Sequence, residues 1–548
     1  MNTINGTESF KKTQDVVTYL RQLKKEIMFN QAGIVKEAVD LIIHAASIGN
    51  TDDEYIGVIE IVATYGALWK MTIEQRDDLY AEVKARFKRN RKTFIDAVNE
   101  KNKAILENMP ENEKTRLMVD MMNATHANTM MGNKNFIMKK VEEEGETVVE
   151  FYRPYELAGV YANDKYTVGH NKKTGEDIKK DRITAWVEHP SCRTYEHGVF
   201  MEPIRPRIDG QKDDFQIREG WLNLWNGFSV SPAQGGSWEK IDWHIRHILA
   251  GGNEDVYKYI LDWCAYAIQY PERPAGSALV FRGTNGIGKG MFSSFFKCLW
   301  GEHGFASNNP KHVVGNFNKH LLNTCLLFLD EAMLAGNKSH ENTIKTLITE
   351  FWLAIEGKGL DVINAKNRLK IMMATNNDWA ITTNKNDRRF CICDVSPEKH
   401  KDYAYFSALD AEMKTKATKQ AFIYDMLTRD ISKYVPGDIP VTEGLKEQRA
   451  QSLPSVWQWW RDCLEREYVS DTSTNGQLWF DVEASSILHA SFVKWCNEIK
   501  YQDEFMKLTN FGKEFSKVYT KKRDSVGVKY NVGYLDTAEK TFKEYFGI

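Results

Sequence analysis

The chain has 548 residues, of which 42% are hydrophobic and 27% are charged, and its formal net charge is −2. At about 150 residues per domain, this length corresponds to three or four domains with enough apolar material for large cores. The balanced charge excludes a globally basic protein, so any contact with nucleic acid requires local patches. No apolar stretch approaches the ~18 residues of a membrane span, and the first residues lack a secretion signal. We therefore expect a cytoplasmic protein with no membrane contact.

The first part of the chain, residues 1–133, has the periodicity of helices. Apolar residues recur three and four positions apart, and glycine and proline are scarce. Thr51 and Glu54 have the spacing of a capping box at the start of one of these helices. The basic run in 84–92 is either a solvated helix face or a contact for nucleic acid. We predict a helical N-terminal domain.

The pattern changes in residues 134–235, where short apolar runs separated by polar turns predict an α+β middle region. Helical spacing returns from Trp238 to Tyr270 and places His244 and His247 on one face. No third metal ligand is spaced with these histidines, and the eight cysteines include no CxxC pair. We therefore predict structural histidines and reduced thiols.

A glycine-rich stretch follows the apolar run Ala278–Phe281 and precedes a segment with helical spacing, 291–299. Strand, glycine-rich loop and helix in this order, with a lysine at the helix start, predict a phosphate-binding loop for ATP. Lys289 is expected to reach the β- and γ-phosphates, whereas Gly290 stands where serine or threonine normally offers a hydroxyl to Mg²⁺. A glycine-rich turn without a ligand is the alternative. The residues expected to bind nucleotide are Gly283, Thr284, Asn285, Gly286, Ile287, Gly288, Lys289, Gly290 and Met291.

Two later apolar runs also end in polar residues. The run 324–329 ends at Asp330 and Glu331, and the run 371–375 ends at Asn376. We predict that Asp330 binds Mg²⁺ and that Glu331 polarises the attacking water. Asn376 is expected to sense the γ-phosphate and to orient that water.

Between these runs we predict a helix over 341–355 and a basic hairpin over 357–370. The hairpin is expected to contact DNA, with Lys366 near its tip, although an ordinary solvated turn is the alternative; the expected contacts are Lys358, Lys366, Arg368 and Lys370. Arg388 and Arg389 precede the apolar strand at 390–394. Paired arginines there suit an arginine finger supplied to a neighbouring subunit, and surface charge is the alternative.

The predicted core with its helical lead-in spans 236–400, and a helical segment follows over 401–475. The tail, 476–548, has two helical stretches, 484–499 and 504–519, then the basic Lys521–Arg523 and a hairpin-like 526–534. This order predicts a winged-helix-like C-terminal module.

Taken together, residues 135–548 resemble a superfamily 3 helicase, above all the helicase part of phage and plasmid primase-helicases, which are related to poxvirus-type enzymes. The resemblance is carried by 283–290, Leu329–Glu331, 357–370, Ala374–Asn376 and Asp387–Arg389, together with the upstream segments 189–195, 200–203 and 223–227. It implies a multidomain α/β protein with a P-loop, AAA+-like ATPase core. It also implies ATP and Mg²⁺ as cofactors, a homo-oligomeric ring, usually a hexamer, and 3′ to 5′ movement on single-stranded DNA.

The function that we expect from this resemblance is unwinding of forked DNA during replication of a phage or mobile element. Residues 1–133 show no paired-acid pattern of a primase-polymerase, so we expect them to form a collar, to contact replication proteins or to bind DNA. An origin-binding initiator whose ATPase melts DNA is one alternative. A nucleotide-switched binding or defence protein that never translocates is another.

Overall fold

The computed structural model describes residues 42–65, 73–107, 110–143, 146–208, 218–309, 313, 315, 318–331, 338–357, 362–469, 479, 481–501, 504–525 and 527–548. Lys358 and the helical patterns at 16–23 and 34–41 lie outside these residues. The chain divides into two compact units, Met1–Phe200 with Gln216–Leu224, and Met201–Phe215 with Trp225–Ile548. Within the described residues, no helix is both long and apolar enough to cross a bilayer.

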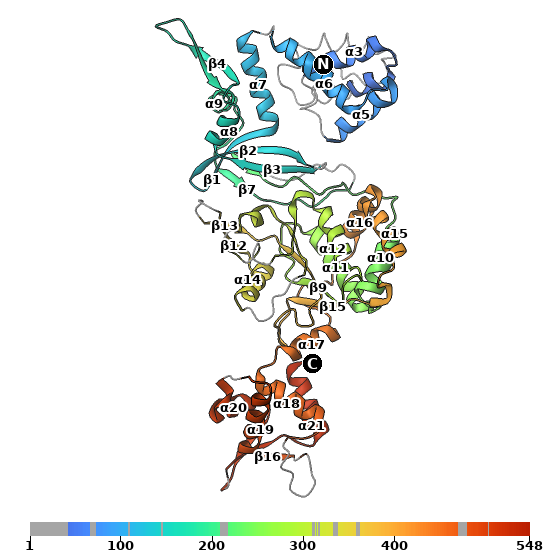
Figure 1. Ribbon diagram of the computed structural model, residues 1–548, viewed down its shortest axis with the longest axis vertical. Helices are drawn as coiled ribbons and strands as arrows, with labels where there is room; N and C mark the ends of the chain where they lie inside the picture. The colour runs from blue at the N-terminus through green and yellow to red at the C-terminus, as the bar shows by residue number, and fades with distance from the viewer. Residues whose placement is uncertain are drawn as a thin grey trace. The chain divides into compact units, whose positions relative to one another are not determined.

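The first unit begins with amphipathic helices, which Figure 1 shows in blue. They are α3 (Asp52–Tyr65), α5 (Ile73–Phe87), α6 (Arg91–Glu107) and α7 (Glu111–Thr125). The capping box is confirmed, because Glu54 accepts from the Thr51 backbone N–H at 3.1 Å and Thr51 Oγ1 accepts from the Glu54 N–H at 3.3 Å. A buried cluster that includes Val58, Val62 and Phe94 joins α3, α5 and α6.

The helical prediction for 1–133 is wrong at its end, because helix gives way to strand at residue 126. Strand β1 (His126–Met131) pairs antiparallel with β2 (Lys134–Glu143), which pairs with β3 (Glu146–Tyr152). These strands and β6 (Thr194–Tyr195) form a sheet of order β3-β2-β1-β6. The boundary expected at 133 therefore falls inside this sheet and inside the first unit.

The rest of the first unit comprises α8 (Pro154–Val160), β4 (Lys165–His170), β5 (Asp177–Asp181), α9 (Arg182–Val187), β7 (Gly198–Phe200) and β8 (Trp221–Asn223). In this part of the unit, α8 and α9 share a buried cluster with α7. Trp186 is fully buried in this core, and its indole donates to Asn123 Oδ1 at 2.8 Å.

The described part of the second unit contains a five-stranded parallel sheet of order β10-β11-β14-β9-β15. The strands are β9 (Ala278–Arg282), β10 (Gly304–Ser307), β11 (Leu326–Leu329), β14 (Lys370–Thr375) and β15 (Phe390–Asp394). Every residue of β9, β11 and β14 is buried, as expected for parallel strands covered on both faces. The carboxyl ends of these strands meet at one edge of the sheet, where open α/β sheets bind ligands.

Helices cover this sheet, as Figure 1 shows for α11 and α12. The helices of this part of the chain are α10 (Glu239–Trp243), the π-helix η2 (His244–Leu249), α11 (Glu254–Gln269), α12 (Lys289–Leu299), α14 (Lys338–Thr349), α15 (Tyr403–Lys414), α16 (Lys416–Thr428) and α17 (Glu443–Gln451). The helix predicted over 341–355 is wrong beyond Thr349. Residues 352–355 form strand β12 (Trp352–Ile355), because they pair antiparallel with β13 (Ile363–Lys366).

The chain ends in a module with its own core. Its elements are α18 (Ser455–Arg466), β16 (Val482–Ala484), α19 (Ser485–Glu498), α20 (Leu508–Phe515), β17 (Thr520–Arg523), β18 (Val528–Asn531) and α21 (Leu535–Phe546). The expected boundary at 475 is corrected, since Trp457, Trp459 and Trp460 of α18 are buried in the same cluster as α19, α20 and α21. The predicted hairpin at 526–534 begins earlier than expected, because its first strand is β17, which contains the basic Lys521–Arg523. The sequence patterns did not predict α21.

Candidate functional site

The glycine-rich loop leaves β9 at its carboxyl end and leads directly into α12. Gly288 has a φ of 89°, and a Cβ there would lie 2.7 Å from both His244 Cε1 and Phe406 Cε1. No side chain fits this position without displacing a ring. His244 Nε2 lies 3.3 Å from the Gly288 carbonyl oxygen, and its Nδ1 lies 2.8 Å from Tyr405 Oη. The buried His244 therefore packs against the glycine-rich loop and holds it in place.

Lys289 is the first residue of α12 and is nearly buried. Its Nζ donates to two carbonyl oxygens of its own loop, Gly283 O at 2.5 Å and Thr284 O at 2.7 Å. Burial lowers the pKa of Lys289, while the carboxylates of Asp330 and Glu331 act in the opposite direction. Hydrogen bonds from an ammonium to anionic oxygens are stronger than those to carbonyl oxygens, so an anionic ligand would compete well for the Lys289 ammonium.

The two acids follow β11, the second strand from β9 in the sheet. The backbone N–H of Asp330 donates to Ser307 O at 3.0 Å, which fixes the acid against the end of β10. Glu331 has a φ of 55°, which is uncommon for a non-glycine residue, and its N–H donates to Asp330 Oδ1 at 3.1 Å. Both side chains are exposed toward solvent.

Asn376 follows β14, which lies between β9 and β11. Its Nδ2 lies 3.5 Å from Asn285 Oδ1 of the glycine-rich loop. The ends of three adjacent strands thus bring the loop, the two acids and the amide together around a pocket of about 510 Å³. The pocket is lined by Asn285, Gly286, Ile287, Gly288, Lys289, Gly290, Met291, Ser294, Phe295, Cys298, Asp330, Glu331, Thr375, Asn376, Asp410, Met413, Lys414 and Lys419.

Several lining residues were missed by the sequence patterns. Asp410, Met413 and Lys414 end α15, and Lys419 lies in the first turns of α16. Lys414 Nζ lies 2.6 Å from Asp410 Oδ2. No motif marks these positions, because a helix–helix turn with lysines is common on protein surfaces. Only the packing of α15 and α16 brings them to the mouth of the pocket.

The position of Gly290 allows a larger side chain. A Cβ there would lie 3.7 Å from Phe328 Cζ and 3.9 Å from Asp330 Oδ2, which are ordinary contacts. Within the described residues, no group of three His, Cys, Asp or Glu side chains could hold a metal by itself. Asp330 and Glu331 still fit Mg²⁺, because this ion usually takes one or two carboxylates and completes its shell with water and substrate phosphates.

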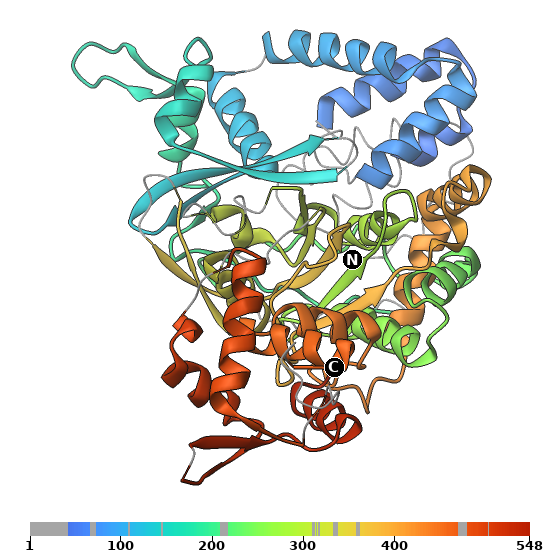
Figure 2. The same ribbon diagram turned by 60° about the horizontal axis from the view of Figure 1, so that its bottom comes forward.

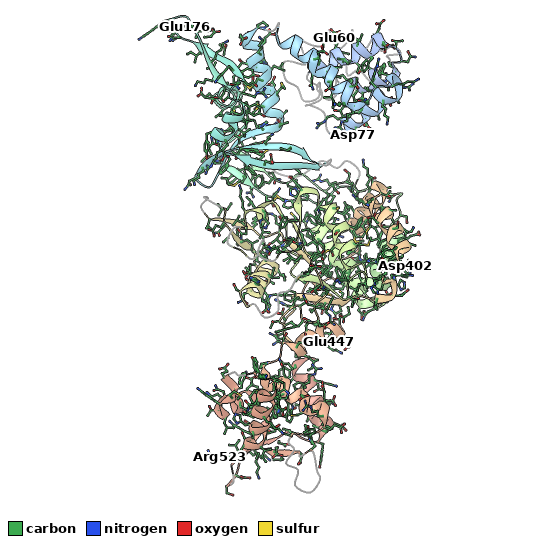
Figure 3. All side chains as sticks on the ribbon, in the orientation of Figure 1. Glu60, Asp77, Glu176, Asp402, Glu447 and Arg523 are labelled. Carbon is green, nitrogen blue, oxygen red and sulfur yellow. The ribbon has the colours of Figure 1, made fainter. Side chains whose placement is uncertain are left out.

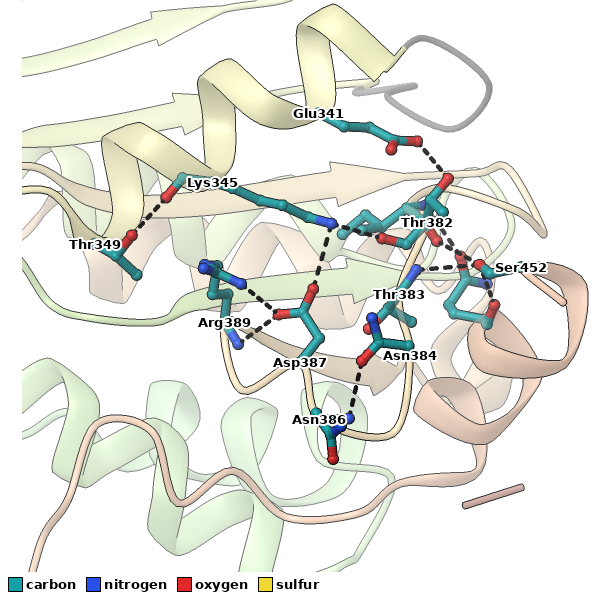
Figure 4. A network of polar contacts seen from close by, with 12 residues as sticks. Glu341, Lys345, Thr349, Thr382, Thr383, Asn384, Asn386, Asp387, Arg389 and Ser452 are labelled. Carbon is teal, nitrogen blue, oxygen red and sulfur yellow. Dashed lines mark hydrogen bonds and ion pairs between the residues drawn. The ribbon is translucent and has the colours of Figure 1, made fainter. Parts of the chain in front are cut away.

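The paired arginines lie at the opposite edge of the sheet from the pocket. Arg389 O accepts from the N–H of Ala278 at 2.7 Å, at the start of β9, whereas the loop follows the end of β9. Figure 4 shows Lys345 and Arg389 directed at Asp387, with N···O distances of 3.4 Å for both ion pairs. Asp387 is buried, so Arg389 is held within its own chain. Arg388 is exposed and forms no ion pair with any described residue.

The basic hairpin requires two corrections. Lys366 pairs with Trp352 at the base of the β12–β13 ladder, whereas the expected tip position would lie between Ile355 and Ile363. Lys370 is fully buried in β14, where its Nζ donates to Pro271 O at 2.5 Å and to Arg368 O at 2.9 Å. Burial lowers the pKa of Lys370 to about 8.

Arg368 is also buried and donates to Lys366 O at 2.6 Å. The expectation that Lys370 and Arg368 contact DNA is therefore wrong, and the exposed Lys366 stays a prediction.

Two histidines are buried among the described residues of the second unit, and of these only His244 contacts the glycine-rich loop. Burial lowers the pKa of His244 to about 4, and it does the same for His303. His303 Nε2 accepts from the N–H of Asn226 at 2.9 Å, and Trp225 stacks on its ring with a centroid distance of 4.5 Å. All eight cysteines are free thiols.

These features define the chain as a multidomain α/β protein with a pocket at the carboxyl edge of a parallel sheet. Residues 281–389, from the end of β9 to Arg389, match a protein family described as a family of unknown function, DUF5906. The chain is 29% identical over 139 residues to a DNA primase-polymerase of Nitratiruptor phage NrS-1, and the match covers 25% of this chain and 19% of that protein. The chain thus spans about a fifth of the length of this curated relative.

Solved structures of the NrS-1 C-terminal region share the fold at low sequence identity. Two apo structures of its A form superpose with TM-scores of 0.51 and 0.52 at 16% identity. Both superpositions cover 74% of this chain, and they cover 96% and 95% of the compared chains. At this identity the likeness concerns the fold alone.

Proposed function

We propose that this chain is an ATP-driven DNA helicase that forms a ring and acts in the replication of a phage or mobile element. The proposed core is a P-loop, AAA+-like ATPase of the superfamily 3 type. The observation that carries the proposal is the meeting of Lys289, Asp330, Glu331 and Asn376 around one pocket at the ends of adjacent parallel strands. The similarity to a phage primase-polymerase supports a replication role, in the cytoplasm of a bacterial host.

The proposed division of labour follows from the geometry. The backbone N–H groups from Asn285 to Gly290 and the start of α12 bind the phosphates, and Lys289 Nζ moves from its carbonyl partners to the β- and γ-phosphate oxygens. Bound Mg²⁺, held by Asp330, would supply neutralisation of the phosphate charge. Glu331 accepts a proton from the attacking water, and Asn376 orients that water.

The arginine finger is proposed to be Arg388, acting on the pocket of a neighbouring subunit. Both arginines lie at the amino-terminal ends of the strands, whereas the pocket of the same subunit lies at the carboxyl ends, so neither fits a role within that subunit. Arg389 is engaged with Asp387, which leaves the exposed Arg388 available to a neighbour. Arg389, Asp387 and Lys345 are proposed to position that segment. This arrangement requires a neighbouring subunit, and the proposed assembly is a ring, with a hexamer as its proposed size.

The proposed DNA contact is the β12–β13 hairpin through Lys366, together with Lys358, which lies outside the described residues. This hairpin follows α14 and leads into β14, and Asn376 directly follows β14. A shift of Asn376 on loss of the γ-phosphate could thereby move the hairpin along single-stranded DNA. Residues 1–133 are proposed to contact replication proteins or DNA.

The test compares Lys289→Ala with Lys297→Ala, which lies later on α12 and does not line the pocket. Steady-state ATP hydrolysis and strand displacement on forked DNA are measured for both proteins, together with ring size. Lys289→Ala should lose both activities, whereas Lys297→Ala should keep them. Normal turnover in Lys289→Ala would refute the ATP site. ATP hydrolysis without strand displacement in the wild type would instead favour a nucleotide-switched protein, and a footprint on one duplex sequence would favour an origin-binding initiator.

A further inference from the structure

The C-terminal module has the element order of a winged helix. Helix α18 is followed by β16, α19, α20 and the hairpin β17–β18, and β18 lies between β16 and β17 in the sheet. In this arrangement α20 takes the place of a recognition helix and β17–β18 takes the place of the wing. Figure 2 shows the hairpin projecting from the helices of the module.

The core of the module holds α20 and the hairpin in a fixed relation. Phe515 stacks on Trp457 with a centroid distance of 5.3 Å, and Glu514 accepts from the Trp457 indole at 2.8 Å. On the hairpin side, Tyr530 is buried and its hydroxyl donates to Gly512 O at 2.8 Å. A hydrogen bond therefore ties the hairpin directly to the backbone of α20.

The surface of α20 and the hairpin is basic. Its exposed cations form no ion pair with any described residue, and they are Lys507, Lys513, Lys521, Lys522 and Arg523. All four residues of β17 are exposed, so both faces of this edge strand are open to a ligand. Figure 3 shows Arg523 at the outer end of the hairpin.

This charge arrangement is unfavourable for the isolated hairpin. Lys522 lies directly opposite Lys529 in the strand register, and like charges in that position destabilise a strand pair. Asp524 pairs with Lys529 at 3.0 Å and lessens this repulsion, whereas no described acidic residue pairs with Lys522. The charge of Lys522 is therefore available to an anionic ligand.

We infer that the basic face, formed by Lys507, Lys513, Lys521, Lys522 and Arg523, binds duplex DNA. An α-helix fits the major groove, which is about 12 Å wide, and the hairpin would then lie along the adjacent phosphates. Single-stranded DNA is a poorer fit, because its binding sites usually offer exposed aromatic rings for base stacking. The aromatic residues of α20 and of the hairpin strands, Phe511, Phe515 and Tyr530, are all buried. This surface is separate from the hairpin β12–β13 that we propose for single-stranded DNA.

The test uses the full-length protein without nucleotide, so its outcome does not depend on the proposed ATPase. The double variant Lys522→Ala/Arg523→Ala is compared with Lys540→Ala/Lys543→Ala, which removes the same charge from α21, where both lysines pair with glutamates. Fluorescence anisotropy measures the Kd for a 5′-labelled duplex of mixed sequence and for one of its strands, at several salt concentrations. Thermal denaturation verifies that both variants are folded.

The wing variant should bind duplex more weakly and with a smaller salt dependence. Each lost phosphate contact removes about 0.9 from the logarithmic salt slope on duplex DNA. For two contacts, the loss of affinity between about 50 and 200 mM salt should become about twelvefold smaller than in the wild type. The α21 variant should match the wild type. An equal effect in both variants, or a loss confined to the single strand, or no duplex binding by the wild type would overturn the inference.

If Lys522→Ala/Arg523→Ala fails to fold, Lys507→Ala/Lys513→Ala, which changes the residue before α20 and one within it, tests the same face. It should also weaken duplex binding relative to the α21 variant. Unchanged duplex affinity in that variant would equally overturn the inference.

Discussion

The glycine-rich loop allows a prediction whose size follows from the structure. Alanine at position 288 would have to adopt a φ of 89°, and its Cβ would lie 2.7 Å from His244 Cε1 and Phe406 Cε1. The left-handed conformation costs roughly 1–2 kcal/mol, and displacing packed rings costs about 1–3 kcal/mol more. We therefore expect Gly288→Ala to lower the free energy of unfolding by about 2–5 kcal/mol and to weaken ATP binding.

Two neighbouring glycines provide matched controls. Gly286 has a φ of 77°, but the nearest atom to a Cβ there is His400 Cδ2 at 3.6 Å, so only the conformational cost of roughly 1–2 kcal/mol applies. Gly290 is the second residue of α12 and has no positive φ, so Gly290→Ala should stabilise the helix by less than the roughly 0.5–1 kcal/mol of a helix interior.

The assay is urea denaturation of the three alanine variants beside the wild type, with nucleotide affinity measured on the same samples. From the most to the least stable protein, the expected order is Gly290→Ala, wild type, Gly286→Ala and Gly288→Ala. A Gly288→Ala protein as stable as the Gly286→Ala protein would refute the argument that the rings of His244 and Phe406 leave no room for a Cβ at position 288.

Four further outcomes are expected. Glu331→Gln should retain ATP and Mg²⁺ binding but slow hydrolysis, as measured by equilibrium binding and phosphate release; loss of nucleotide binding instead would reverse the roles assigned to the two acids. Arg388→Ala should bind nucleotide yet turn over slowly, and mixing it with Lys289→Ala protein should restore part of the activity, because some mixed interfaces keep both groups; verified mixed rings without any rescue would place the arginine in its own subunit. Lys366→Ala should weaken single-strand binding for every sequence and reduce the salt slope by about 0.7, so an unchanged slope would remove this residue from the DNA contact. The pKa of His244 is lowered from 6.5 to about 4, so the unfolded state takes up the proton first as the pH falls. The contribution of His244 is complete above pH 6.5 and is lost between pH 6.5 and 4, by about 3 kcal/mol. Because burial lowers the pKa of His303 and His126 to about 4 as well, urea denaturation of the wild type across this range should show a larger loss, and a variant that replaces His244 should show a smaller one.

Several features were accessible from local sequence because they depend on short-range chemistry. The capping box at Thr51 and Glu54 needs only two residues three positions apart, and its hydrogen bonds are present. The apolar runs at 278–281, 324–329 and 371–375 lie in or overlap buried strands, since continuous apolar residues suit a sheet covered on both faces. The polar residues that follow these runs could be identified from the sequence, although the pocket that they share could not.

Other features depend on contacts between distant residues, which periodicity does not contain. Residues 352–355 continue a helical pattern but form a strand, because β13 pairs with them. Lys370 has the composition of a DNA contact, yet β14 buries it against carbonyl oxygens that satisfy its ammonium. His244 reaches the glycine-rich loop, and the residues at the end of α15 reach the pocket, only because distant helices pack beside the loop. The sequence by itself determined which residues are candidates for the chemistry, and the tertiary structure decided which of them are exposed, which are buried and which face the same pocket. The physical reason is that burial and pairing depend on the neighbours that folding brings into contact, whereas residue type and spacing are set along the chain.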